Sequence, residues 1–229
     1  ARAHKKFSMN QENILWQTIT EGQDSHFLGY ETLTSDAEIR KISKNNEHTI
    51  LILNQTPFYA ESGGQIGDTG VICVDEHQLI VENTIYDTGT SIMHICKGHI
   101  ADDLLKNKVE CIVDKNCRQA IRSNHTATHL LHSALKTVLG DHVHQAGSLV
   151  SPDYLRFDLT HNNKINSSQL IKIEYLVNEE ILHNTHLTVE VKPFETARKE
   201  GVEALFGEKY GDEVRVISVG EFSKELCGG

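Results

Sequence analysis

The sequence has little positive charge and no long apolar run. Lys and Arg total 22 against 32 Asp and Glu, which gives a formal net charge of −10. Tight, unspecific nucleic-acid binding needs surplus cations to neutralise phosphates, so this composition argues against it, although other domains could still deliver one RNA end. No apolar run approaches the roughly 18 residues of a membrane-spanning helix, so we expect no membrane partner.

Cysteine is scarce and unpatterned. The five cysteines are an odd number, and no two have the CxxC spacing. A disulfide scaffold is therefore not expected, which favours the reducing cytosol. The basic N-terminus lacks the apolar segment of a signal peptide and does not begin with Met. We expect the chain to be a piece of a longer cytoplasmic protein.

Between about residues 27 and 113, short β-branched stretches alternate with Asn, Asp, Gly and His. Strands are predicted over 49–53, 70–74, 79–81 and 109–113. Several short strands with turns between them indicate a small β-barrel or folded sheet.

After Asp114 the pattern becomes mixed. Helices are predicted over about 114–140, 167–183 and 195–205, and strands over 142–150, 155–159, 187–191 and 214–219. We predict an α+β protein with three parts. They are a helical tail over 1–25, a glycine-rich β-barrel subdomain over 26–114, and an α+β core with an antiparallel sheet over 115–229.

Two histidines four residues apart, His125 and His129, fall on one face of the predicted helix. Two imidazoles that close can hold one metal ion. Random placement of 14 histidines gives about 0.8 such pairs, so a solvated polar face is an open alternative. Arg118 and Arg122 share this stripe and could face an anionic substrate, or solvent.

A loop with four glycines in eight residues lies at 56–70. Glycine allows unusual backbone angles and close approach of a ligand or another segment. The loop lacks the Gly-Lys-Ser/Thr ending of a P-loop. A tight hairpin without a ligand is an equal alternative.

Six separated motifs together resemble the editing domain of alanyl-tRNA synthetase, from about residue 26 onward. They are FYAESGGQ (58–65), HTATHLL (125–131), QAGS (145–148), LRFD (155–158), ALFGEKYG (204–211) and ELCGG (225–229). The resemblance implies hydrolytic removal of serine or glycine wrongly attached to alanine tRNA. It also implies that residues 1–25 end a tRNA-binding helical region, and that the parent synthetase ligates alanine to tRNA using ATP at a site elsewhere.

The resemblance further implies a zinc site with His125, His129 and Cys227 as ligands. The family pattern places a fourth ligand two positions beyond Gly229, so these residues supply three, and we expect weakened zinc occupancy. Zinc could polarise the ester carbonyl, activate water or orient the substrate.

The resemblance places Thr128 and Gln145 in the substrate pocket, where a polar group could pair with the serine hydroxyl; Ser148 is expected on the pocket wall. Alternatively, Thr128 only packs beside the helix. The loop residues Glu61, Gly63, Gly64 and Gln65 are expected either to contact the tRNA end or to be structural. His132 is expected behind the metal or in the core, and Arg156 is expected to pair with Asp158.

Three functions follow. The first is an editing hydrolase within an alanyl-tRNA synthetase, whose partners are the acceptor end of alanine tRNA and the remaining domains. The second is a freestanding trans-editing deacylase. The third is a non-catalytic tRNA-docking or zinc-structural module.

Overall fold

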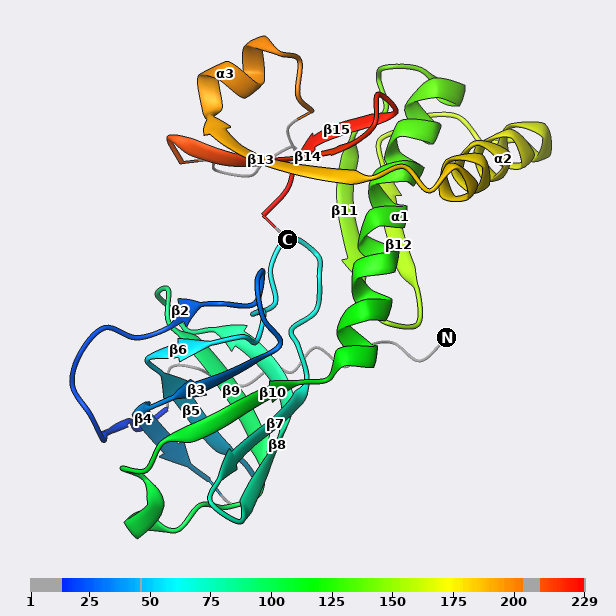
Figure 1. Ribbon diagram of the computed structural model, residues 1–229. Helices are drawn as coiled ribbons and strands as arrows, with labels where there is room; N and C mark the ends of the chain where they lie inside the picture. The colour runs from blue at the N-terminus through cyan, green and yellow to red at the C-terminus, as the bar shows by residue number, and fades with distance from the viewer. Residues whose placement is uncertain (1–13, 46, 204–210, 229) are drawn as a thin grey trace. The chain divides into compact units, whose positions relative to one another are not determined.

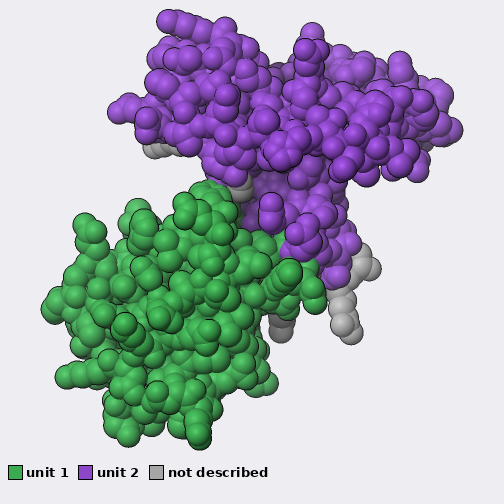
Figure 2. Space-filling view, in the orientation of Figure 1, with its two compact units in different colours: residues 1–61, 67–118 green, residues 62–66, 119–229 purple. Residues whose placement is uncertain are grey.

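The computed structural model describes residues 14–45, 47–203 and 211–228. The chain divides into two compact units (Figure 2): unit 1 holds residues 1–61 and 67–118, and unit 2 holds residues 62–66 and 119–229. The described residues form three α-helices and several sheets, which confirms the α+β class. None of these helices combines the length and the apolar character needed to cross a bilayer.

Unit 1 is a curled antiparallel sheet (Figure 1). Its strand order is β1 (Gln17–Thr18), β4 (Ile39–Lys44), β5 (Thr49–Leu53), β9 (Ile92–Lys97), β8 (His77–Tyr86), β7 (Gly70–Val74), β10 (Val109–Val113) and β3 (Thr34–Ala37). A short parallel pair, β2 (His26–Phe27) with β6 (Gln55–Thr56), and a 3-10 turn at Asp102–Leu104 complete the unit. The expected strands 49–53, 70–74 and 109–113 are confirmed.

The helical tail expected over 1–25 is wrong where the structure describes it. Residues 14–25 contain no helix, and β1 pairs with β4 instead. Ile14 and Trp16 pack against one apolar cluster, whereas Ile19 packs against another. Side chains that alternate between two faces belong to extended chain, and tertiary burial overrides the approximate helical spacing. Residues 1–13 of the expected helix lie outside the described part of the chain.

Unit 2 is built on α1 (Lys115–Leu139). The Asp114 carboxylate caps its start by accepting the N–H groups of Asn116 (2.9 Å) and Cys117 (3.0 Å), and Gly140, at φ +111°, follows its end. The other elements are β11 (Gln145–Val150), β12 (Leu155–Leu159), α2 (Ser167–His183), β13 (Leu187–Pro193), α3 (Phe194–Lys199), β14 (Glu213–Val219) and β15 (Ser223–Leu226). β11 pairs with β12, and β13, β14 and β15 form an antiparallel sheet.

The boundary between the units differs from the expected position after residue 114. The first residues of α1 belong to unit 1, because Arg118 is buried there beside Asp68. Residues 62–66 of the glycine-rich loop belong to unit 2, because Gln65 bridges Val150 of β11 in parallel. At both places, tertiary contacts rather than neighbours in the sequence determine which unit a residue belongs to.

The stability of unit 1 depends on pH because the unit contains a buried histidine, His94. His94 Nδ1 lies 3.1 Å from the Leu51 carbonyl oxygen, which can only accept, so Nδ1 carries the proton. Nε2 then accepts from the Thr56 hydroxyl at 2.7 Å. Burial lowers the pKa of His94 to about 4, against the smaller opposing effect of the Leu51 carbonyl.

We expect acid to destabilise unit 1 through His94. Below the ordinary histidine pKa of about 6.5, His94 is protonated in the unfolded chain but stays neutral in the folded chain. The free energy of unfolding therefore decreases as the pH falls from about 6.5 to about 4. This loss reaches about 3 kcal/mol. Urea unfolding followed by fluorescence of Trp16, the single tryptophan, should show His94→Gln losing less stability over that range than the wild type. His77→Gln, at an exposed position, should keep the wild-type slope; equal slopes in all three proteins would contradict the prediction.

Candidate metal centre

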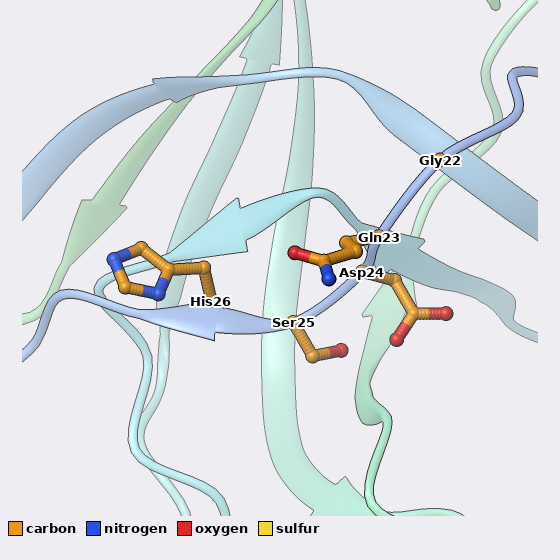
Figure 3. Close-up of a pocket in the computed structure, with 5 residues that line it drawn as sticks. All are labelled: Gly22, Gln23, Asp24, Ser25 and His26. Carbon is orange, nitrogen blue, oxygen red and sulfur yellow. The ribbon is translucent and has the colours of Figure 1, made fainter.

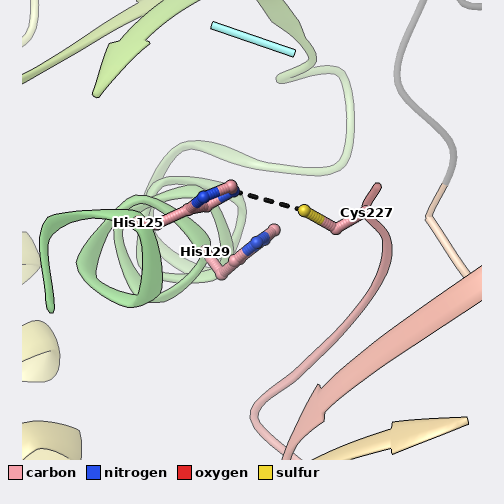
Figure 4. Close-up of side chains that lie close together, drawn as sticks. All are labelled: His125, His129 and Cys227. Carbon is pink, nitrogen blue, oxygen red and sulfur yellow. Dashed lines mark hydrogen bonds between the residues drawn. The ribbon is translucent and has the colours of Figure 1, made fainter. Parts of the chain in front are cut away.

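Helix α1 and the segment after β15 bring three metal-binding side chains together in unit 2 (Figure 4). The candidate ligand atoms of His125, His129 and Cys227 all lie within 4.8 Å of one another. Cys227 Sγ is 3.2 Å from His125 Nε2. The two imidazole rings are stacked, with centroids 5.1 Å apart and an interplanar angle of 14°. The i,i+4 spacing on one helix face accounts for this stacking.

The opposite ring nitrogens of both histidines are already engaged. His125 Nδ1 lies 2.6 Å from Gln65 Oε1, and His129 Nδ1 lies 2.7 Å from Glu225 Oε2. The other Glu225 oxygen is 3.1 Å from Nδ1 of His132, which is buried. Oxygen acceptors on Nδ1 leave Nε2 free for a metal, an arrangement typical of histidine ligands.

A second observation also indicates that these three residues could bind a metal ion. His129 Nε2 is buried and has no hydrogen-bond partner among the described residues. A buried polar nitrogen without a partner is costly, and a metal bond would satisfy it. Two imidazoles and one thiol are donors that zinc accepts readily, and a tetrahedral site would leave one position for a further ligand.

The titratable groups of this cluster shift one another's pKa values toward the charged forms. Burial by itself raises the pKa of the Cys227 thiol, but the neighbouring His125 and His129 outweigh it and bring the pKa down to about 5. Burial lowers the pKa of His129, yet interactions with Cys227 and Glu225 raise it to about 10. For Glu225, burial raises the pKa, and the two histidines lower it to about 2. A thiol with a low pKa supplies the thiolate that binds metals.

The expected pocket residues also lie in unit 2. Thr128, one position before His129 on α1, is buried, and its hydroxyl donates to the Asn124 carbonyl at 2.8 Å. Gln145 Nε2 donates to Ser148 Oγ at 3.2 Å on β11. Ser148 Oγ lies 3.5 Å from the Gly63 carbonyl oxygen. The Thr128 oxygen can still accept a hydrogen bond, because donation to the helix leaves its lone pairs available.

The four expected loop residues divide between the units. Gly63, Gly64 and Gln65 belong to unit 2, whereas Glu61 is exposed in unit 1, with its backbone N–H donating to the Thr84 carbonyl at 2.9 Å. Arg156 pairs with Asp158 at 3.0 Å, as expected. Of the ALFGEKYG motif, residues 204–210 lie outside the described part of the chain.

Glu225 is the residue at this centre that sequence reasoning missed. A signal was present, because Glu225 lies in the same ELCGG motif as Cys227, two positions before it. The chain gives no local sign, however, that the carboxylate reaches His129, which is 96 positions away.

A cavity of about 570 Å³ in unit 1 is lined by Gly22, Gln23, Asp24, Ser25 and His26 (Figure 3). Two of its polar side chains have structural partners. Asp24 accepts from Ser91 Oγ at 3.0 Å, and Ser25 Oγ accepts the Ile92 N–H at 2.7 Å. We therefore assign it no chemistry.

Residues 1–117, half of the chain, match the family described as tRNA synthetases class II (A). The chain belongs to this family. It is 43% identical to an alanine–tRNA ligase of Hydrogenovibrio crunogenus over 238 residues, which is all of this chain and 27% of that protein. It is 42% identical to the enzyme of the same name from Orientia tsutsugamushi, over 96% of this chain and 27% of that protein. The chain thus spans about a quarter of the length of the class II synthetase relatives it matches.

Proposed function

We propose that this chain is the editing part of an alanine–tRNA ligase and hydrolyses the ester that joins serine or glycine to the end of alanine tRNA. The observation that carries the proposal is the convergence of His125, His129 and Cys227, supported by the names of the matched relatives. The longer protein would ligate alanine to tRNA with ATP at a site elsewhere, in the cytosol. The net charge of −10 agrees with tRNA being held chiefly by other domains.

We propose that the ion is zinc, held by His125, His129 and Cys227. When bound, zinc supplies Lewis-acid polarisation of an ester carbonyl or of a water molecule. Gln65 and Glu225 hold the two imidazoles by Nδ1. Thr128 and Gln145 then select the substrate by accepting or donating a hydrogen bond at the amino-acid side chain. Ser148 and the glycine-rich loop form the wall beside them.

Serine and alanine differ by one hydroxyl, so the pocket must offer that hydroxyl a partner. A buried polar group left unpaired by alanine costs about 1–3 kcal/mol, which is about 5- to 150-fold in rate. The Thr128 hydroxyl donates to Asn124 and can accept from serine. Thr128→Val keeps the side-chain shape and removes the acceptor, so it should lower the preference for serine by about 10-fold or more.

The test compares alanine tRNA charged with serine or with alanine, incubated with this chain and with the longer ligase that carries it. Release of serine and retention of alanine supports editing. Thr137→Val is the matched control, because its hydroxyl makes the same bond to Ser133 at 2.9 Å on an exposed part of the helix. Binding of tRNA without release of either amino acid would identify a docking module and overturn the proposal.

A further inference from the structure

The glycine-rich loop is held in register along β11. The Val150 N–H donates to the Gly64 carbonyl at 2.8 Å, and the Ile66 N–H donates to the Val150 carbonyl at 3.1 Å. Gly64 has φ +83°, and a Cβ there would lie 2.2 Å from Ser148 Oγ. Only glycine permits this approach, so the residue that follows, Gln65, is fixed in position.

The Gln65 side chain is buried, with 5% of the residue exposed. Its Oε1 lies 2.6 Å from His125 Nδ1. An amide oxygen can only accept, so Nδ1 carries a ring proton, and in the neutral ring the lone pair is on Nε2. That Nε2 is the atom 3.2 Å from Cys227 Sγ. The orientation and tautomer of one candidate ligand are therefore set by a side chain 60 positions away in sequence.

We propose that Gln65 is a positioning residue of the metal centre, so that the glycine-rich loop is a structural part of the metal site. This inference rests on the proposed function only in taking the cluster to bind zinc. Glu225 Oε2 contacts Nδ1 of the second histidine, His129, in the same way at 2.7 Å. A contact to the tRNA end is the alternative role for Gln65, but its amide oxygen already accepts a hydrogen bond from His125.

Two variants distinguish the effect of the amide oxygen from the effect of side-chain volume. Gln65→Met fills the same space but replaces the oxygen by a weakly accepting sulfur, and Gln65→Glu keeps an oxygen acceptor for Nδ1–H. Loss of such a partner typically weakens metal binding by about 10- to 100-fold. Competition with a chromophoric zinc chelator should therefore show about 10- to 100-fold weaker binding for Gln65→Met, and near wild-type binding for Gln65→Glu. Gln119→Ala, at an exposed position on the same helix, should match the wild type.

The tautomer gives a second readout that needs neither metal nor tRNA. In ¹⁵N-histidine NMR spectra of the wild type, His125 should show a protonated Nδ1, and Gln65→Met should lose that signature. Equal zinc affinity in the wild type and Gln65→Met would overturn the role of Gln65, as would equally weak binding by the Met and Glu variants. A wild type that binds zinc but releases no serine would instead overturn the proposed function alone. A wild type that binds no zinc would overturn both.

Discussion

Replacement of Arg118 by alanine is expected to lower the free energy of unfolding of unit 1 by about 3–5 kcal/mol, because it leaves a buried carboxylate without its partner. The Arg118 and Asp68 side chains are only 8% and 1% exposed. Arg118 Nε donates to both carboxylate oxygens of Asp68, at 2.9 and 3.0 Å, and Nη2 bonds the same carboxylate. Nη1 donates to the Gly29 carbonyl at 2.8 Å, and Nη2 also donates to the Pro57 carbonyl at 2.9 Å.

Urea unfolding followed by Trp16 fluorescence measures this loss, since Trp16 packs within unit 1. Arg122→Ala is the matched control, because Arg122 is exposed one turn further along the same helix, and its unfolding free energy should stay within about 0.5 kcal/mol of the wild type. Replacing both partners, as in Asp68→Asn with Arg118→Met, should cost less than the sum of the single changes, since no buried charge remains. Additive losses, or an Arg118→Ala loss near that of Arg122→Ala, would contradict the prediction.

Arg118 also shows where sequence reasoning failed. Its position on a polar helix stripe favoured a solvated side chain, but the structure buries it. The partner, Asp68, lies 50 positions away, and nothing local to either residue marks the pairing. Helical spacing shows which side chains share a face, whereas the surroundings of that face depend on tertiary contacts.

Elements with a strong, long pattern could be predicted. The sequence predicted the two long helices and the apolar strands 49–53, 70–74 and 109–113. In each of them, apolar residues follow the pattern that is typical of that kind of element. Short or edge elements such as β1 and β15 were missed, because two to four residues carry too little periodicity. The second long helix begins at the expected residue 167, and Asn166 and Gln169 form a capping box at its start.

The candidate site likewise has a part that the sequence could predict and a part that it could not. The histidine pair was readable from its i,i+4 spacing, and the resemblance added Cys227 from the far end of the chain. Gln65 was expected either to contact the tRNA end or to be structural, and Glu225 was quoted in the ELCGG motif without a role. Both reach their histidines across tertiary distance, by 60 and 96 positions, so sequence spacing could not assign their contacts.

Replacement of Cys227 by alanine is the change expected to affect the proposed chemistry most. It removes one of three candidate ligands and leaves two imidazoles, which is too few donors for a stable zinc site. Loss of a partner behind a ligand already costs about 10- to 100-fold, so loss of a ligand itself should lower zinc affinity and serine release by about 100-fold or more. Zinc stoichiometry by elemental analysis and serine release from serine-charged alanine tRNA measure the two effects.

Cys73→Ala is the control, because Cys73 is a free, half-buried cysteine on β7 in unit 1, and this variant should retain both zinc and activity. Treatment of the wild type with a strong chelator should reproduce the Cys227→Ala loss, and added zinc should restore the wild type but not the variant. Circular dichroism at 222 nm should show that α1 and α2 persist in Cys227→Ala, since their apolar packing does not include the thiol. Full serine release by a folded, zinc-free Cys227→Ala would mean that Thr128, Gln145 and the loop act without a metal. The catalytic part of the zinc proposal would then have to be given up.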